Sequence, residues 1–162
     1  MFRPDGSRVD IDYKTRLLAQ AAVALGQSVM VSEVHGMSQR GGSVISHLKI
    51  NGSEAPLIRR GTADLLLALA PDEAVRNLVF LRRGGVAFAN TENSLRPEVA
   101  GHLDRLNIQV LALPASRMAM ELGSAAVTNA ILVGFAAAHP ALPLSIDALR
   151  DTLAVIASRS AS

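Results

Sequence analysis

The sequence predicts a single Rossmann-like α/β domain, in which helices cover both faces of a mainly parallel sheet. Segments typical of strands alternate along the chain with segments typical of helices, which is the pattern of βαβ units. Residues 64–69 (DLLLAL) form a short continuous apolar run, as central parallel strands do, and Pro71 follows at the first position of a helix. With 162 residues, 49% of them apolar, the chain can bury a substantial core, which excludes disorder for most of it.

The first predicted helix covers residues 14–25, where apolar side chains recur at helical spacing from Leu17 to Leu25. Asp12 is a candidate N-cap, because its carboxylate can accept a hydrogen bond from a backbone amide of the first turn. Gly26 then ends the helix, since glycine adopts the left-handed conformation at low cost.

Two strands follow this helix. Residues 28–34 (SVMVSEV) are β-rich and almost entirely apolar, so they predict a buried strand. Residues 43–50 alternate between two faces, one drier than the other, and predict a second strand that ends at the turn Asn51-Gly52.

The remainder of the chain continues the alternation. The helix that begins at Pro71 is predicted over residues 72–81, with two acidic residues in its first turn, and Gly84-Gly85 is predicted to end it. The other predicted elements are strands at 86–89 and 108–113 and helices at 115–122, 125–138 and 145–157.

Composition excludes several classes of function. The chain has 16 basic and 14 acidic residues and only 3% aromatics, so neither a basic nucleic-acid surface nor a platform for stacking bases is indicated. It has no cysteine, which excludes disulfides and thiolate-held zinc or iron–sulfur sites, and its four histidines show no metal-ligand spacing. We expect no metal site in this chain.

A membrane or exported protein is also not indicated. The longest apolar stretch, residues 130–138, is much shorter than the ~20 residues that cross a bilayer. Residues 1–13 carry several charges and lack the apolar core of a secretion signal. We therefore expect a cytoplasmic protein without a membrane partner.

The connection between the first two predicted strands has an unusual composition. It consists of His35, Gly36, Met37, Ser38, Gln39, Arg40, Gly41 and Gly42. Glycines let a backbone approach a ligand closely, an arginine fork suits carboxylate or phosphate oxygens, and ligands of open α/β sheets bind beyond strand ends. We expect an anionic ligand or a partner surface here. The alternative is a tight hairpin in which Gly41 and Gly42 only turn the chain and Arg40 is solvated.

Within this segment Arg40 is the strongest functional candidate, because its planar guanidinium can hold a carboxylate or phosphate at two points; the alternative is an interface salt bridge. His35 could orient a carboxylate or transfer a proton, although a role in capping or bracing the loop is favoured. Ser38 and Gln39 are expected to shape the loop as hydrogen-bond donors, and Met37 to pack. None of these side chains is assigned a catalytic role.

Three residues outside the segment also carry polar groups at informative places. Asn129 lies in the apolar helical run 125–138, so its amide needs a partner if it is buried, either a ligand or a loop that it braces. His47 shares a strand face with Lys49, which predicts a solvated or interface position. Asp64 precedes a core strand and is expected to cap or turn the chain.

The segment also carries a resemblance to a known family. The run EVHGMSQRGGSV at residues 33–44, continued by Ser46-His47, closely resembles the signature of the gamma subunit or domain of 2-oxoacid:ferredoxin oxidoreductases. The same domain forms the beta subunit of indolepyruvate:ferredoxin oxidoreductase. The resemblance covers roughly residues 17–153 and continues through residues 61–67, 71–76, 84–85, 90–91, 121–123 and 129–134.

The resemblance implies a gamma-type domain over residues 17–157 that is a subunit of an oxidoreductase and inactive alone. Enzymes of this family oxidatively decarboxylate pyruvate, indolepyruvate or a related 2-oxoacid on thiamine diphosphate. They pass electrons through iron–sulfur clusters to ferredoxin and the acyl group to coenzyme A. The implied partners are the thiamine-diphosphate-binding and iron–sulfur subunits, which hold these cofactors and Mg in the assembled complex, while this chain binds none alone.

One departure from the family pattern lies at the N-terminus. Family members open with an apolar strand and a glycine-rich loop before the first helix, whereas residues 1–16 of this chain lack that loop. This departure motivates an alternative, a free-standing nucleotide or acyl-CoA binding module without catalysis. A homodimeric scaffold is a third possibility. The small polar tail at residues 158–162 is expected to fray.

Overall fold

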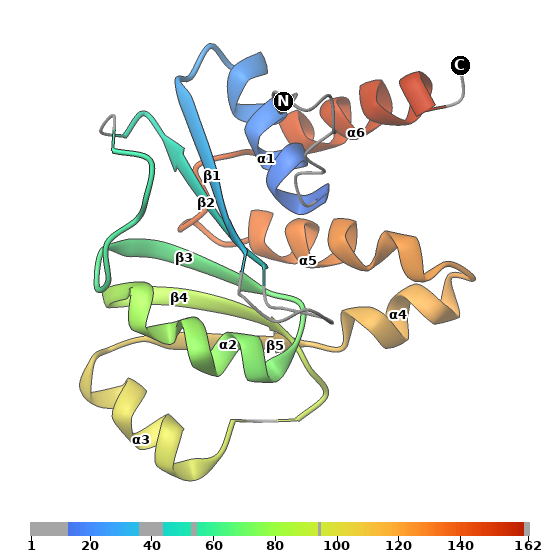
Figure 1. The fold of residues 1–162 in the computed structure, drawn as a ribbon. Coiled ribbons are helices and arrows are strands. Elements are labelled where there is room, and N and C mark those ends of the chain that lie inside the picture. Colours follow the sequence, from blue (N-terminus) through green and yellow to red (C-terminus); the bar gives the residue numbers. More distant parts are fainter. Residues whose placement is uncertain (1–12, 36–43, 53–54, 94, 161–162) are drawn as a thin grey trace.

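A computed structural model describes residues 13–35, 44–52, 55–93 and 95–160 (Figure 1). Within these ranges a three-stranded parallel sheet, in the order β3-β4-β5, lies beside a two-stranded antiparallel sheet of β1 and β2. The strands are β1 (Val29–His35), β2 (Val44–Ile50), β3 (Ala63–Ala68), β4 (Leu81–Asn90) and β5 (Gln109–Leu113). The helices are α1 (Tyr13–Ala24), α2 (Pro71–Asn77), α3 (Pro97–Arg105), α4 (Ala115–Glu121), α5 (Thr128–Ala137) and α6 (Ile146–Ser160).

The parallel sheet is a β3-α2-β4-α3-β5 unit, of which the sequence predicts the three strands and α2. Helices cover both of its faces, also as predicted. On one face, side chains of β4 such as Phe88 pack with α1, α5 and α6 in the largest core cluster. On the other face, Ala87 of β4 packs with Leu103 of α3 and with Leu78 and Phe80, which lie just after α2.

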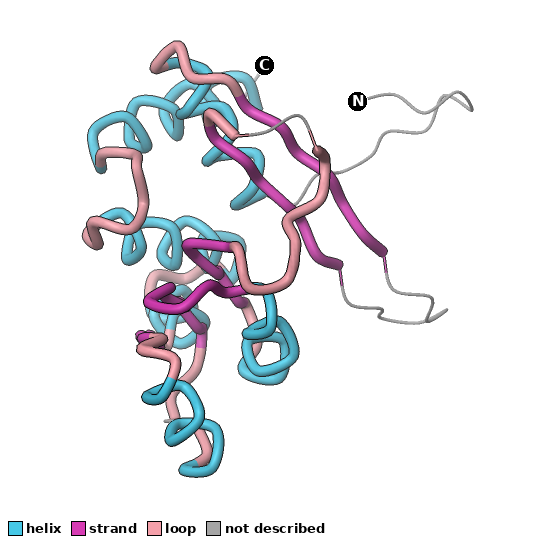
Figure 2. The backbone as a smooth tube through the Cα atoms, turned by 90° about the vertical axis from the view of Figure 1, so that its left-hand side faces the viewer, coloured by secondary structure: helices cyan, strands magenta, loops and turns pink. Residues whose placement is uncertain are grey.

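The expectation of one mainly parallel sheet is wrong for the first two strands. β1 and β2 pair antiparallel from Val29↔Ile50 to His35↔Val44, and Figure 2 shows them apart from the parallel sheet. β1 is not the buried strand that its apolar composition predicts, because none of its residues is fully buried. The hairpin packs against α1. Its strands therefore contact more solvent than the central strand of a sheet that helices cover on both faces.

Several predicted boundaries also shift. The second helix ends at Asn77 and continues only as a 3₁₀ turn, Leu78–Phe80, so Gly84 and Gly85 do not end a helix but lie within β4. Glycine is favoured at position 85, because a Cβ would lie 3.0 Å from the carbonyl oxygen of Arg82 in the same strand and 3.3 Å from that of Ala63 on the neighbouring strand, both tight contacts. Close backbone contacts within the sheet therefore account for a glycine that the sequence suggests is a helix stop.

The remaining elements agree more closely with the sequence. Gly26 does end α1, with φ of +75° as expected for a left-handed helix stop. Asp12, the candidate N-cap, lies outside the described residues. The sequence analysis missed α3, although Pro97 begins it and Glu98 lies in its first turn. No helix in the described ranges is both long and apolar enough to cross a membrane.

Candidate functional site

The structure places the two ends of the glycine-rich segment but not the segment itself. Seven of the predicted site residues lie outside the described residues: Gly36, Met37, Ser38, Gln39, Arg40, Gly41 and Gly42. His35 and Val44, which flank the segment, are opposite each other at the end of the β1-β2 hairpin. The segment therefore connects two antiparallel neighbours. We expected a ligand at this segment because ligands of open α/β sheets bind beyond the carboxyl ends of parallel strands. The segment instead follows β1, which is not a strand of the parallel sheet.

A small polar cluster lies at the end of the hairpin. Glu33 faces Ser46 across the two strands, and the Ser46 hydroxyl donates a hydrogen bond of 3.3 Å to Oε1 of Glu33. The other carboxylate oxygen, Oε2, lies 3.5 Å from Nε2 of His35. The Glu33 side chain is only 7% exposed whereas that of His35 is 48% exposed. A buried carboxylate thus lies beside a histidine that solvent can reach.

Two exposed valines lie near the same end of the hairpin. Val34 is 42% exposed and Val44 is 54% exposed. Because Val34 pairs with Ile45 and Val44 pairs with His35, the two valines lie on opposite faces of the ribbon. The hairpin therefore presents apolar surface on both faces at the end that carries the glycine-rich segment.

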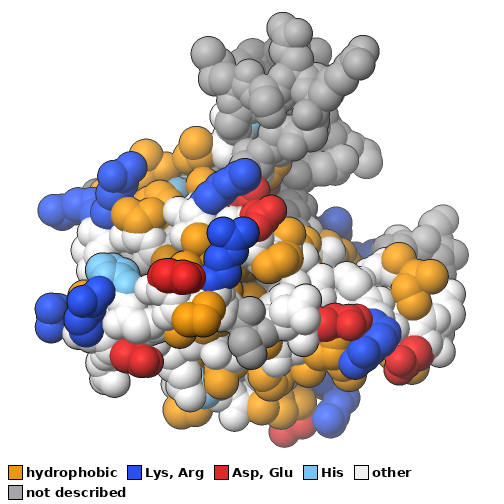
Figure 3. Space-filling view, turned by 90° about the horizontal axis from the view of Figure 1, so that it is seen from below, with side chains coloured by type: hydrophobic (Ala, Val, Ile, Leu, Met, Phe, Trp, Pro, Cys, Tyr) orange, Lys and Arg blue, Asp and Glu red, His pale blue; other side chains and the backbone are white. Residues whose placement is uncertain are grey.

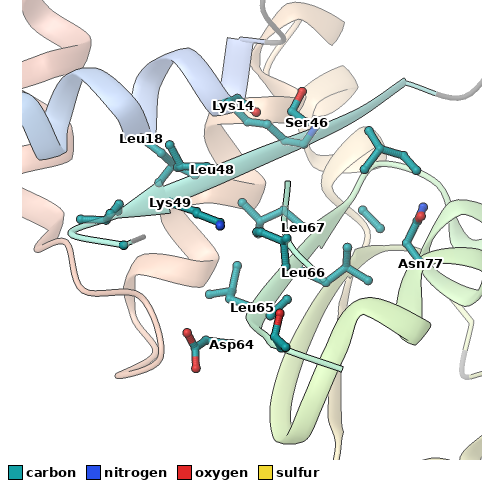
Figure 4. Close-up of a pocket in the computed structure, with 18 of the residues that line it drawn as sticks. Lys14, Leu18, Ser46, Leu48, Lys49, Asp64, Leu65, Leu66, Leu67 and Asn77 are labelled. Carbon is teal, nitrogen blue, oxygen red and sulfur yellow. The ribbon is translucent and has the colours of Figure 1, made fainter. Parts of the chain in front are cut away.

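A cavity of about 1110 Å³ lies between β2 and β3 (Figure 4). Its lining comes from the start of α1, from β2, from β3 and from the connection between these strands. Leucines, including Leu48, Leu65 and Leu67, dominate its walls. Its charged lining residues are of both signs: Lys14, Lys49, Arg59, Asp64 and Glu73. The described residues contain no group of three or more histidine, aspartate or glutamate side chains that could hold a metal ion.

The solvated or interface position predicted for His47 is wrong, because the residue is buried. It is 6% exposed, and its Nδ1 accepts a hydrogen bond of 3.1 Å from the backbone amide of Ile58. Its ring meets the edge of Phe80 at a centroid distance of 5.3 Å. Burial, and secondarily the charge of Lys49, lowers the pKa of His47 below its ordinary value, which favours the neutral ring. His47 is an anchor of the hairpin.

A second polar junction, which the sequence analysis did not single out, lies at the carboxyl edge of the parallel sheet. Asn90 ends β4, and its Nδ2 donates to the Leu69 carbonyl at 2.9 Å and to the Ser116 hydroxyl at 2.7 Å. The backbone amide of Ser116 donates in return to Oδ1 of Asn90 at 3.0 Å. Asn90 therefore joins the end of β3 to the start of α4, and an asparagine directly after an apolar strand was the available signal.

Asn129 lies on α5 and is half-buried. Its Oδ1 is buried without a hydrogen-bond partner among the described residues. Within the described part of the chain, no loop donates a hydrogen bond to this oxygen, so the expected bracing contact of Asn129 is not observed there. Asp64 is exposed and forms an ion pair of 2.6 Å with Arg82.

Comparison with known proteins agrees with this architecture. Residues 13–161 match the family model described as pyruvate ferredoxin/flavodoxin oxidoreductase. The chain is 34% identical over 154 residues to the indolepyruvate oxidoreductase subunit IorB of Archaeoglobus fulgidus, across 85% of this chain and 77% of that protein. It is 32% identical over 152 residues to the IorB subunit of Pyrococcus horikoshii, across 85% of this chain and 75% of that protein.

Two solved structures share the fold. Subunit PORC of pyruvate oxidoreductase from Thermotoga maritima superimposes with a TM-score of 0.65 at 17% identity, over 88% of this chain and 76% of that one. The 2-oxoglutarate:ferredoxin oxidoreductase of Magnetococcus marinus, solved with 2-oxoglutarate, coenzyme A and succinyl-CoA bound, gives 0.67 at 16% identity over 91% of this chain and 25% of that one. The resemblance inferred from residues 33–44 is confirmed. The chain belongs to the pyruvate ferredoxin/flavodoxin oxidoreductase family and is an oxidoreductase subunit of the type represented by its indolepyruvate oxidoreductase relatives.

Proposed function

We propose that this chain is the gamma-type subunit of an indolepyruvate:ferredoxin oxidoreductase and that its hairpin docks the glycine-rich segment into a catalytic partner subunit. The observation that carries the docking proposal is the end of the hairpin, where exposed Val34 and Val44 lie on opposite faces beside the buried Glu33 carboxylate. Apolar surface on two faces suits insertion between partner surfaces better than contact along one of them. Residues 36–42 then meet the partner or its bound coenzyme A.

The donor groups of this chain do not fit the redox cofactors of the family. Iron–sulfur clusters are held by cysteine thiolates, and the sequence has none. Thiamine diphosphate requires a divalent ion, and the described residues offer no cluster of three ligands for one. The proposal therefore assigns thiamine diphosphate, Mg and the clusters to partner subunits, and no chemical step to this chain.

Co-purification tests the assembly. A tagged chain expressed in its native cell is expected to bring down a thiamine-diphosphate-binding, iron–sulfur-containing partner, recognised by its thiamine content, its iron content and its visible absorption. A tagged chain that is folded but recovers neither cofactor would contradict the proposal. If the chain alone then binds coenzyme A or an adenine nucleotide in calorimetry, it is the free-standing binding module instead.

Arg40 tests the role of the segment within the complex. Arg40→Gln removes a charged hydrogen-bond donor, so partner affinity or coenzyme A turnover should fall on the order of tenfold or more. Arg105→Gln is the matched control, because Arg105 is an exposed arginine in the last turn of α3. The face of the molecule in Figure 3 carries acidic, basic and apolar side chains interspersed. Equal behaviour of the two variants would exclude a specific role for Arg40.

The substrate is tested on the purified complex. Ferredoxin reduction should be faster with indolepyruvate than with pyruvate or 2-oxoglutarate at equal concentrations. A clear preference for pyruvate would retain the assembly and overturn the proposed substrate. Because this chain is assigned no catalytic residue, the choice of substrate is expected to depend on the partner subunit.

A further inference from the structure

Two turns with the sequence Arg-Arg-Gly lie at the start of the parallel sheet. The tripeptide occurs at residues 59–61, just before β3, and again at residues 82–84, at the start of β4. Both glycines have a left-handed backbone conformation, with φ of +72° at Gly61 and +71° at Gly84. Such a turn favours glycine at that position but places no demand on the two residues before it. The repeated arginines therefore need another explanation.

Backbone hydrogen bonds hold both turns at the same edge of the sheet. The amide of Gly61 donates to the carbonyl of Val79 at 2.9 Å, which holds the first turn against the segment before β4. The amide of Gly84 donates to the carbonyl of Leu106 at 3.1 Å, which holds the second turn against the segment before β5. Because β3 and β4 are parallel neighbours, the two turns lie together at the amino ends of these strands.

The two turns carry more positive charge than the fold neutralises. All four of their arginines are exposed, and Arg82 forms the ion pair with Asp64. Among the described residues, no carboxylate lies within ion-pair distance of Arg59, Arg60 or Arg83. Figure 3 shows Lys and Arg side chains at the left of the lower face, the side on which β3 and β4 begin in Figure 1.

The surroundings of the turns favour a large partner over a small ligand. Arg60 and Arg83 line neither the cavity between β2 and β3 nor a second cavity, of about 520 Å³, beside the start of β4. Leu57 and Val79, next to the first turn, are 48% and 44% exposed. The arginines therefore lie on an open surface together with apolar side chains.

The same composition favours a protein over a nucleic acid. Protein interfaces are enriched in arginine and depleted of lysine, and both turns carry arginine alone. Single strands of nucleic acid bind by stacking bases on exposed aromatic rings, and no aromatic side chain in the described ranges is exposed. The unpaired charge is positive, so the matching protein surface is acidic.

We propose that the two Arg-Arg-Gly turns form a docking surface for a protein whose own surface is acidic and partly apolar. Carboxylates of this partner pair with Arg59, Arg60 and Arg83, as Asp64 of this chain pairs with Arg82. Its apolar side chains cover Leu57 and Val79. The end of the hairpin that leads into the glycine-rich segment lies away from these turns (Figure 1), so the inference does not depend on the proposed function.

Binding of a labelled peptide of glutamates interspersed with leucines to the full chain tests the surface. Arg60→Gln combined with Arg83→Gln removes two charged donors that make no side-chain bond within the described fold, so affinity should fall at least about tenfold. The control combines Arg16→Gln and Arg159→Gln, at exposed positions on α1 and α6, and should change affinity little. Equal losses in the two double variants, or no binding to the unmodified chain at low ionic strength, would overturn the proposal.

Two comparisons test the kind of partner. Leu57→Ser should weaken binding of the leucine-containing peptide but not of a peptide of glutamates alone, and an equal effect on both would overturn the apolar part of the surface. Single-stranded DNA of the same charge should bind more weakly than the leucine-containing peptide. Tighter binding of the DNA would overturn the proposal in favour of a nucleic-acid surface.

The partner itself is sought with the tagged full chain in its native cell. A protein recovered by the unmodified and control chains, lost with Arg60→Gln and Arg83→Gln and released at high salt, would complete the evidence from the peptide. Equal recovery of every protein by all three chains would contradict docking at these turns.

Discussion

The parallel sheet and the hairpin differ in burial although both are built from apolar strands. In β4, five consecutive residues from Gly85 to Ala89 are buried, because strands flank it on both sides and helices cover both faces. In β1, the residues are half-buried or exposed. The sheet forms the buried centre of the domain, whereas the hairpin leaves more of its side chains exposed. Side-chain replacements should therefore cost most in the sheet, less at the anchors of the hairpin and least on the surface.

The largest effect is expected at the centre of the parallel sheet. Phe88 is 0% exposed and meets Phe135 edge to face at 5.4 Å, so Phe88→Ala should lower the free energy of unfolding by about 3–5 kcal/mol. Val86→Ala, at a residue of β4 that is 3% exposed, and Val31→Ala on β1 form the matched pair for the two regions, and the change at Val31 should cost clearly less. Urea denaturation of these variants measures the difference. Equal losses would contradict the division between the two regions.

The next largest effect is expected at the hairpin anchor. His47→Ala leaves the buried amide of Ile58 without its acceptor, which should cost about 1–3 kcal/mol in the free energy of unfolding. His47→Asn is the control, because Oδ1 of asparagine can replace Nδ1 as the acceptor. A loss as large in His47→Asn as in His47→Ala would indicate that packing against Phe80, rather than the hydrogen bond, holds the hairpin in place.

The same residue predicts a pH dependence. Because the pKa of His47 is lower in the folded protein than in the unfolded chain, the unfolded chain binds the proton more readily. The contribution of His47 to stability is therefore complete above pH about 6.5 and is lost as the pH falls through the folded pKa. The loss of stability between pH 7.5 and acidic pH, measured by denaturation, should be smaller in His47→Asn than in the unmodified protein.

A moderate effect is expected at the carboxyl edge of the sheet. Asn90→Ala removes the side-chain bonds to Leu69 and Ser116, and the partly solvated position should limit the cost to about 1–2 kcal/mol. Asn93→Ala, at an exposed residue three positions later, should change stability by no more than about 0.5 kcal/mol. Thermal unfolding of both variants compares them. If Asn90→Ala resembles Asn93→Ala, the junction does not tie α4 to the sheet.

The smallest effect is expected at the surface of the same sheet. The side chains of Asp64 and Arg82 are 70% and 49% exposed, so solvent screens their ion pair despite the short distance. Asp64→Asn should lower the free energy of unfolding by at most about 1 kcal/mol, and less in high salt. Denaturation at low and high ionic strength tests this. A larger, salt-independent loss would mean that the pair braces the β3-β4 contact.

Which residues the sequence could assign correctly depended on how local their signals were. Helix periodicity placed α1, and the apolar run at residues 64–69 placed β3, because both patterns reflect burial of one element against any apolar neighbour. His47 was assigned to the surface because alternation along a strand separates two faces but does not say which neighbours cover each face. Of the candidate site residues, only His35 and Asn129 lie in the described part of the chain.

By itself, the sequence determined the type and order of most elements and, through residues 33–44, the family. Only the tertiary structure decided that β1 and β2 form a hairpin apart from β3, that Gly84 and Gly85 lie inside a strand, and that β2 and β3 border a cavity. The physical reason is that side-chain periodicity records contacts perpendicular to a strand. Pairing between strands uses backbone groups, which are nearly identical at every residue and leave little trace in the sequence.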